Sequence, residues 1–206
     1  LRAFADRSGV WRYPVTADEV SPLYVQALTG YEDQWFWWHP GINPLALVRA
    51  AWQWLRYGEI VSGGSTLTMQ VARIIEPASR TVPGKMRQIL RALQLEAHLS
   101  KRQILTLYLD NAPFGGTIEG VEAASWAYLG KSAQHLSHAE AALLAVLPQA
   151  PSHMRPDRHP RRARQARDKV LDRLVAEGIW SPQVAAAAKI EPVVALLADS
   201  VTSVLV

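Results

Sequence analysis

The sequence predicts a mainly α-helical fold, and two kinds of observation support it. Helix-start signals recur along the chain, each a capping residue followed by proline: Ser21-Pro22, Asn43-Pro44 and Ser181-Pro182. Two capping boxes add further helix starts, Ser100 with Gln103 and Ser137 with Glu140. At 206 residues the chain is long enough for one good core, so one compact domain is the simplest prediction.

The first half of the chain begins with the only predicted β element. Residues 1–5 and 10–14 flank a polar turn and predict a small N-terminal hairpin. A helix is expected to start at Pro22, a second to cover 44–57, a third to follow Thr66, and two more to cover 83–99 and 101–111. In the fourth of these, one stripe is apolar and is expected to face inward: Met86, Ile89, Leu90, Leu93 and Ala97.

The second half continues the helical pattern. Residues 115–117 read as a loop, and helices are expected over 121–128, 138–147, 160–177 and from 182 onward. The helix over 160–177 lies in an arginine-rich segment, which favours a solvated basic face. The apolar tail over 193–206 has no predicted place in the fold.

Composition narrows the function classes. The chain has a net charge of +4 and a pI near 9.6, which suits anionic lipid, nucleic acid or a polyphosphorylated substrate equally. It lacks cysteine, which excludes disulfides and thiolate metal sites. No nucleic-acid motif is present. No apolar run reaches the roughly 20 residues of a membrane span, so an anchor is expected only outside this sequence.

Glu32 is the strongest candidate for a catalytic residue. It precedes Asp33 and a run of large aromatic residues over 35–38, where a desolvated carboxyl group would acquire a pKa suited to a general base. The alternative is structural: one of these acids caps a helix or pairs with an arginine. His39 has no second histidine or acid at metal-binding spacing, so no metal is assigned to it.

The segment Gly63-Gly64-Ser65-Thr66 is a candidate anion cradle. Its amides and hydroxyls precede a helix, where a phosphate is readily held, although the P-loop spacing is missing. Gln70 and Arg73 share one face of that helix, and Lys85 and Gln88 share one face of the next. The competing interpretations are a plain helix entry and a solvated basic face.

The helix over 44–57 is apolar nearly all round and carries Trp52 and Trp54 beside Arg49 and Arg56. Such a helix is either buried in a core or lies at a membrane interface. The sequence does not decide between these two environments.

Taken together, these segments resemble the peptidoglycan glycosyltransferase domain of class A penicillin-binding proteins. The matching motifs are Glu32-Asp33-x-x-Phe36-x-x-His39-x-Gly41, the run from Gly63 to Gln70, Leu95-Glu96-x-x-x-Ser100-Lys101-x-x-Ile104-Leu105-x-x-Tyr108-Leu109, and Tyr128-x-Gly130-Lys131. The runs 111–117 and 147–152 look most like the 1C branch of that family.

The resemblance implies a lysozyme-like glycosyltransferase domain over 1–192, with a membrane-facing jaw at about 43–62. Residues 193–206 would lead toward a transpeptidase domain, whose Ser-x-x-Lys and Lys-Thr-Gly motifs the sequence lacks. It implies polymerisation of lipid II into glycan strands at the periplasmic face of the bacterial cytoplasmic membrane. The implied partners are lipid II, the growing strand, the membrane surface and the inhibitor moenomycin, and nucleic acid is not among them.

The resemblance also implies residue roles. Glu32 would be the general base, Asp33 would support it, and Lys85 and Gln88 would complete the catalytic set. The substrate side would comprise Phe36, His39, Gly64, Ser65, Thr66, Gln70 and Arg73. No cofactor is required by these motifs, and a divalent cation such as Mg²⁺ is an open alternative.

Two departures from the family pattern bear on function. The usual Arg-Lys-x-x-Glu motif reads Gly84-Lys85-Met86-Arg87-Gln88, and Met69 replaces a frequent glutamine. Gln88 is either a neutral positioning residue or a sign of weak or altered activity, and the sequence alone predicts that Gln88→Glu is tolerated or mildly alters metal dependence. Two other functions compete with polymerisation: a non-catalytic module that binds lipid II or a partner, and a lysozyme-like lytic enzyme.

Overall fold

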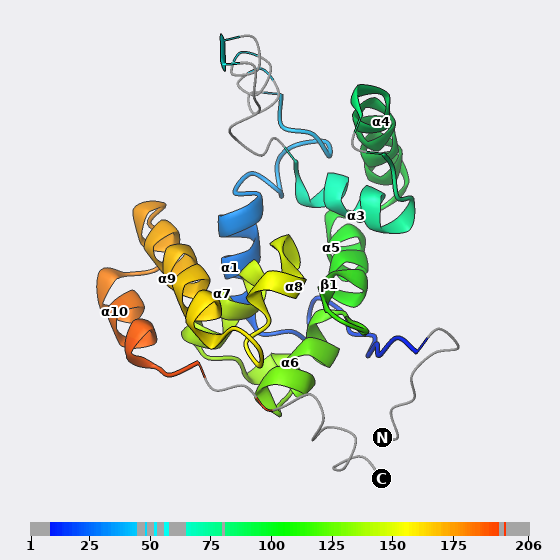
Figure 1. Ribbon diagram of the computed structural model, residues 1–206. Helices are drawn as coiled ribbons and strands as arrows, with labels where there is room; N and C mark the ends of the chain where they lie inside the picture. Colours follow the sequence, from blue (N-terminus) through cyan, green and yellow to red (C-terminus); the bar gives the residue numbers. More distant parts are fainter. Residues whose placement is uncertain are drawn as a thin grey trace. The chain divides into compact units, whose positions relative to one another are not determined.

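The computed structural model describes residues 9–44, 48, 52, 56–57, 65–79, 81–193 and 196. The chain divides into two compact units (Figure 1). The inserted unit is Glu32–Tyr108, and the flanking unit combines Leu1–Tyr31 with Leu109–Val206. The two units are described separately below.

The flanking unit is built mainly of helices. They are α1 (Pro22–Glu32, whose last residue belongs to the inserted unit), α6 (Val121–Leu129), α7 (His138–Val146), α8 (Pro151–Met154), α9 (Pro160–Ala176) and α10 (Pro182–Ile190), with short 3₁₀ turns at Ala133–His135 and Leu147–Gln149. Ser137 and Glu140 form the predicted capping box at the start of α7, and the Ser181 side chain caps α10. The helix starts read from the sequence are confirmed here, because caps are local features that a short stretch of sequence specifies.

The core of the flanking unit lies where α7 packs against α9 and α10, which are drawn close together in Figure 1. Leu143, Leu144 and Val146 of α7 are buried, as are Val170 and Leu171 of α9. Every residue of α7 from Ala139 to Val146 except Glu140 is buried, so this alanine-rich helix is enclosed on almost all sides.

A two-stranded antiparallel sheet flanks the predicted loop over 115–117, which forms the turn between its strands. β1 (Pro113–Gly115) pairs with β2 (Ile118–Glu119), and Trp11 adds a single parallel bridge to Ile118. Glycines at positive φ make the tight turn possible, including Gly115 (φ 111°) and Gly116 (φ 60°). Of the predicted N-terminal hairpin, residues 1–5 lie outside the described residues, and Trp11 of the second segment pairs with β2.

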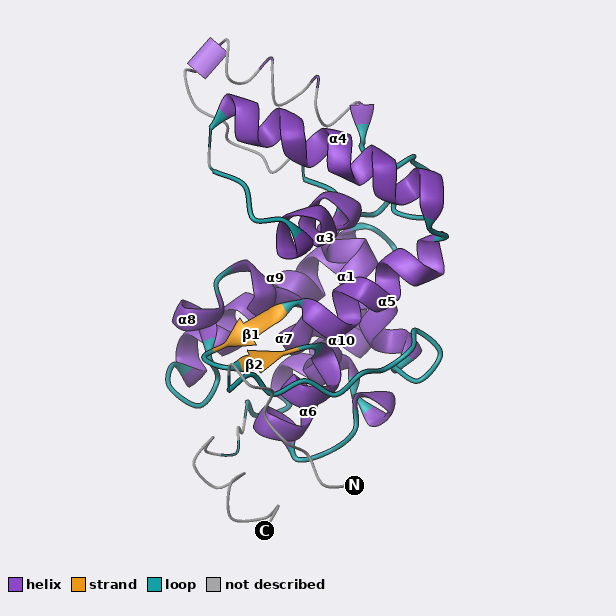
Figure 2. Ribbon diagram, turned by 90° about the vertical axis from the view of Figure 1, so that its right-hand side faces the viewer, coloured by secondary structure: helices purple, strands orange, loops and turns teal. Residues whose placement is uncertain are grey.

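The inserted unit contains α3 (Leu67–Ile75), α4 (Val82–His98) and most of α5 (Lys101–Asn111). Figure 2 shows α3 beside α4. Met69 and Ala72 of α3 meet Ala92 of α4 in a small buried cluster, against which Ile42 and Ile89 also pack. Gly84 lets the backbone of Ser79, just before α4, approach the first turn of this helix closely. A Cβ atom at position 84 would lie 2.1 Å from the carbonyl oxygen of Ser79.

The predicted inward stripe of α4 is wrong for most of its residues. Only Ile89 packs against the cluster, whereas Met86, Leu90 and Leu93 are exposed. The buried face of α4 consists instead of Gly84, Gln88 and Ala92. Small and polar residues occupy the contact because α3 approaches α4 closely, and the larger apolar side chains are left on the outer face.

The helix expected over 44–57 is described at only five positions, residues 44, 48, 52, 56 and 57, and all five are helical. Trp52 and Tyr57 are more than half exposed, and the Arg56 guanidinium lies 5.5 Å from the Trp52 ring centre. Trp54 lies outside the described residues. Trp52 therefore belongs to an exposed aromatic surface and not to a core. Within the described part of the chain, no helix combines the length and apolarity needed to cross a bilayer.

Candidate active site

Glu32 is the last residue of α1 and is held by α3. Its carboxylate oxygen Oε2 accepts a hydrogen bond of 2.8 Å from the side-chain amide of Gln70. The Glu32 side chain is only partly buried, so a ligand can reach it. The amide donor fixes the carboxylate without neutralising it, because glutamine carries no charge.

The tryptophans that follow Glu32 do not enclose it in the way the sequence suggested. Trp35, Trp37 and Trp38 are 58%, 43% and 83% exposed, and only Phe36 of this run is buried. Exposed indoles cannot supply a desolvated pocket, so the expectation of an apolar enclosure is not met by these three residues.

Asp33 is buried and organises the loop that follows Glu32. Both of its carboxylate oxygens accept from Nε2 of His39, at 2.8 and 2.9 Å, and Oδ2 also accepts from the backbone N–H of Leu67. The Gly41 N–H donates to Nδ1 of His39, so the ring proton is on Nε2 and points at Asp33. Asp33 and His39 thus tie this loop to the first residue of α3.

Thr66 joins the same anchor. Its hydroxyl accepts from the Met69 N–H as the N-cap of α3 and donates to the Gly41 carbonyl at 2.6 Å. Gly41 adopts φ +83°, and a Cβ atom there would lie 2.7 Å from Cγ of Glu96. The predicted phosphate-binding hydroxyl of Thr66 is therefore engaged in positioning α3.

A second, partly buried network of contacts holds the loop through His39 and Phe36. Lys101 donates to the His39 carbonyl and to Glu96, both at 2.6 Å, and its ammonium lies 4.6 Å from the Phe36 ring centre. Thr68 donates to the same Glu96 oxygen. In the sequence, Glu96 and Lys101 were recognised only as residues of a family motif, and no structural role was predicted for them. Their oppositely charged side chains, five residues apart, were the one available signal.

Lys85 and Arg73 form the electropositive part of the site. The Lys85 ammonium donates to the Ser65 hydroxyl at 2.7 Å and to Oε1 of Gln88 at 3.0 Å. Burial, together with the positive charge of Arg73, lowers the pKa of Lys85 below the ordinary lysine value. Arg73 is exposed, and no carboxylate among the described residues pairs with either cation. Two close cations without an acidic partner favour an anionic ligand.

The predicted site residues thus fall into two groups that meet on α3. Gln70 of α3 holds Glu32, and one turn further along Arg73 lies within electrostatic reach of Lys85. Phe36, His39 and Thr66 are buried, and their contacts hold the loop that follows Glu32 in place. Gly64 lies outside the described residues. Among the residues described, no three metal-ligating side chains come together.

Comparison with known proteins places the chain in a family. Residues 2–175 match the family model described as Transglycosylase. The chain is 62% identical over 193 residues to penicillin-binding protein 1C of Escherichia coli, covering 94% of this chain and 25% of that protein. It is 42% identical to penicillin-binding protein 1A of Aquifex aeolicus, covering 84% of this chain and 24% of that protein.

A solved structure shows the same fold. The crystal structure of penicillin-binding protein 1A from Haemophilus influenzae aligns with a TM-score of 0.57 and 26% identity, covering 95% of this chain and 20% of that one. The family match and these relatives support an enzyme of the peptidoglycan glycosyltransferase class. The chain belongs to the transglycosylase family, and it spans about a quarter of the length of these curated relatives.

Proposed function

We propose that this domain polymerises lipid II into glycan strands, with Glu32 as general base and undecaprenyl pyrophosphate as leaving group. The observation that carries the proposal is the double role of α3. The same short helix fixes the carboxylate of Glu32 through Gln70 and brings Arg73 near Lys85. A base and an anion site on one rigid element are what transfer from a diphosphate donor requires.

The proposed step is an inverting displacement. Glu32 takes the proton of the acceptor sugar's 4-hydroxyl, and that oxygen forms a bond to the anomeric carbon of the donor. The bond between this carbon and the pyrophosphate oxygen breaks, and the diphosphate leaves with the electron pair. Lys85, Arg73 and the Ser65 hydroxyl stabilise the negative charge that develops on it. The reaction would take place at the periplasmic face of the cytoplasmic membrane, where a lipid-linked donor resides.

Substitution of the base tests the assignment most directly. We expect Glu32→Gln to abolish strand growth from lipid II, since an amide cannot accept the proton, while the unfolding midpoint stays close to that of the wild type. Gel analysis of the glycan product measures the loss. Asp172→Asn is the matched control, because Asp172 is an exposed carboxylate in the flanking unit, paired with Lys189. Substantial polymerisation by Glu32→Gln would overturn the assignment.

The two competing functions give different products in the same preparation. A lytic enzyme would release soluble muropeptides from sacculi without lipid II. A binding module would retain lipid II and compete with moenomycin but yield no polymer under conditions in which a known polymerase works. Either result would replace the proposed reaction.

A further inference from the structure

Gln88 is a buried amide whose two ends both have partners. It is 9% exposed, in the face of α4 that packs against α3. Its Oε1 accepts from the Lys85 ammonium at 3.0 Å, and its Nε2 donates to the backbone carbonyl of Met69 at 2.6 Å. An ammonium can only donate and a carbonyl can only accept, so the two contacts fix the orientation of the amide.

The position of Met69 gives this bridge a functional meaning. Met69 lies one residue before Gln70, which holds Glu32, and its own N–H is bonded by the Thr66 cap. The Gln88 side chain thereby connects the Lys85 ammonium on α4 to the turn of α3 that contains Gln70, the residue that holds Glu32. We infer that Gln88 is a positioning residue that aims Lys85 at the leaving group, and that its neutrality is required for this role.

Only a neutral side chain with both a donor and an acceptor satisfies this geometry. An ionised glutamate at position 88 would place a carboxylate oxygen against the Met69 carbonyl, where the amide N–H now lies. It would also neutralise Lys85 and add a negative charge beside a departing diphosphate. A protonated glutamate would restore both hydrogen bonds. The contact with Met69 therefore reverses the expectation from the sequence that Gln88→Glu is tolerated.

The experiment compares Gln88→Glu with the wild type across pH 5 to 8. The readouts are the affinity for inorganic pyrophosphate by calorimetry and the rate of strand growth from lipid II. At the acid end we expect the variant to approach the wild type. As the pH rises through the pKa of the new carboxyl group, its affinity relative to wild type should fall by about tenfold or more, the loss expected for hydrogen bonds to a charged group. Each ratio is taken at one pH, which cancels the ionisation of pyrophosphate itself.

Two further variants separate positioning from structural damage. Gln94→Glu makes the same chemical change on an exposed part of α4, where Gln94 contacts Arg91, and should follow the wild type at every pH. Gln88→Leu removes both hydrogen bonds without adding charge, and should bind pyrophosphate more weakly by a factor that does not change with pH. Folding of each variant is checked by thermal unfolding at pH 5 and pH 8.

The inference rests on the proposed function, and the outcomes distinguish the two. A wild-type protein that neither binds pyrophosphate nor extends glycan would refute the proposed function. A wild-type protein that does both, together with a Gln88→Glu variant whose affinity ratio to wild type stays near one at every pH, would refute the role of Gln88 alone. Wild-type affinity in both Gln88 variants would have the same consequence.

Discussion

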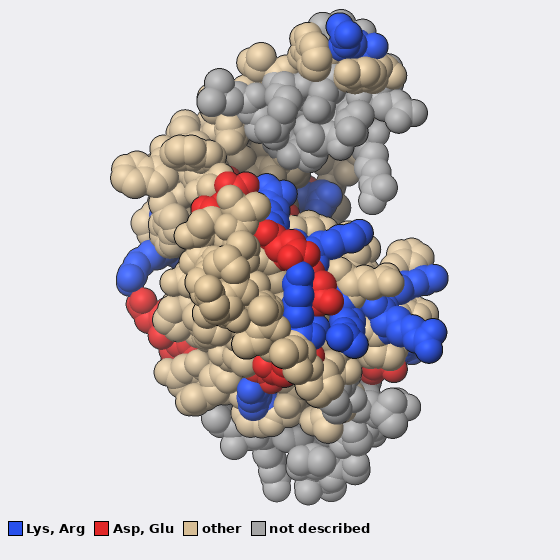
Figure 3. All heavy atoms as spheres, turned by 90° about the vertical axis from the view of Figure 1, so that its left-hand side faces the viewer, with Lys and Arg blue, Asp and Glu red and all other residues tan. Residues whose placement is uncertain are grey.

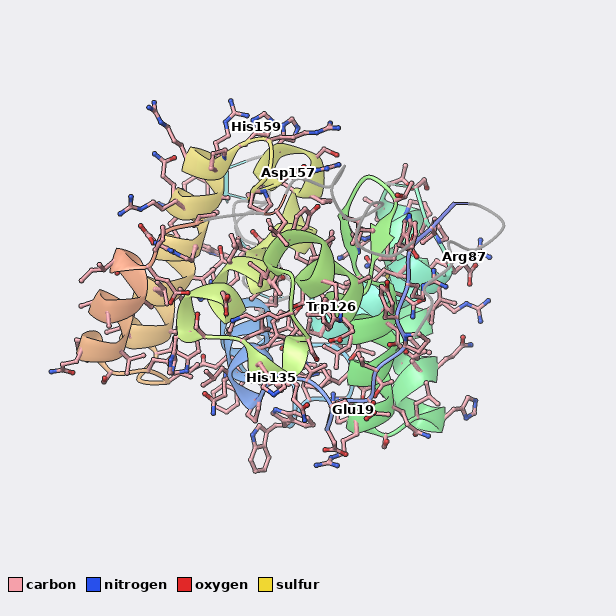
Figure 4. The ribbon with its side chains drawn as sticks, turned by 90° about the horizontal axis from the view of Figure 1, so that it is seen from below. Glu19, Arg87, Trp126, His135, Asp157 and His159 are labelled. Carbon is pink, nitrogen blue, oxygen red and sulfur yellow. The ribbon has the colours of Figure 1, made fainter. Side chains whose placement is uncertain are left out.

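Arg155 and Arg167, the buried cations of the flanking unit, have acidic partners, whereas the inserted unit contains one paired cation, Lys101 with Glu96, and one without a carboxylate partner among the described residues, Lys85. In the flanking unit, Arg155 forms a two-pronged pair with Asp157, a residue labelled in the loop before α9 in Figure 4. Arg167 contacts Asp168 and the carbonyls at the end of α10. In the inserted unit, the half-buried Lys85 has only the neutral partners Ser65 and Gln88 among the described residues. A cation without a counter-charge costs stability and is retained where a ligand supplies the missing charge.

The apolar surface shows the same contrast. Of the large hydrophobic side chains that are exposed among the described residues, eleven belong to the inserted unit and three to the flanking unit. On the face that carries α9 and α10, Figure 3 shows basic and acidic side chains next to one another, and the pair of Lys189 with Asp172 links these two helices. Among the described residues, the inserted unit therefore exposes most of the large apolar side chains and leaves this apolar area, together with the Lys85 charge, for other molecules.

The largest expected effect on stability is in the flanking unit. Arg167→Met should lower the free energy of unfolding by about 1.5–3 kcal/mol, because the buried guanidinium bonds the carbonyls of Lys189 and Glu191. Urea denaturation measures this loss, and pyrophosphate affinity should not change. Arg161→Met, an exposed change on the same helix, is the control. Equal stability of the two variants would contradict the view that the flanking unit depends on its paired cations.

A smaller loss of stability is expected at the cap of α3. Thr66→Val removes the hydroxyl that bonds Met69 and Gly41, which should cost about 1–2 kcal/mol. The rate of strand growth should fall further in Thr66→Val than in Ser137→Ala, which removes the N-cap hydroxyl of α7 in the flanking unit. If the two cap variants lose activity in parallel with stability, α3 has no special part in the site.

The smallest stability effect is expected at Lys85. Lys85→Met should change the free energy of unfolding by no more than about 0.5 kcal/mol, or raise it, because a partly desolvated charge is removed. Pyrophosphate affinity should nevertheless be lost.

In the unchanged protein the affinity for pyrophosphate should decline as the pH rises through the pKa of Lys85, since the ammonium loses its proton there. Burial and Arg73 place this pKa below the ordinary lysine value, so Arg73→Gln should move the decline to higher pH. A strongly destabilised Lys85→Met variant would show that the cation is structural.

Local sequence determined much of the fold. The starts of α1, α7 and α10 follow from their capping residues, and Gly130 ends α6 in the left-handed conformation that glycine favours. The candidate site residues Glu32, Gln70, Arg73 and Lys85 were also present in the motifs, and the resemblance to the family implied their roles. Such features depend on neighbours within about one helical turn, which a linear pattern records.

Tertiary structure decided the rest, because those outcomes depend on residues distant in sequence. Packing against α3 turned the small face of α4 inward and left Met86 and Leu90 exposed, against the reading of amphipathicity. Two contacts join segments that no local pattern connects: Trp11 pairs with Ile118, and Asp33 accepts a hydrogen bond from the backbone N–H of Leu67. The sequence by itself identified the candidate residues of the site, through its motifs and the family that these motifs resemble. The packing of α3 against α4 decided which of them contact one another, because only close approach in space sets a hydrogen bond such as that from Gln88 to Met69.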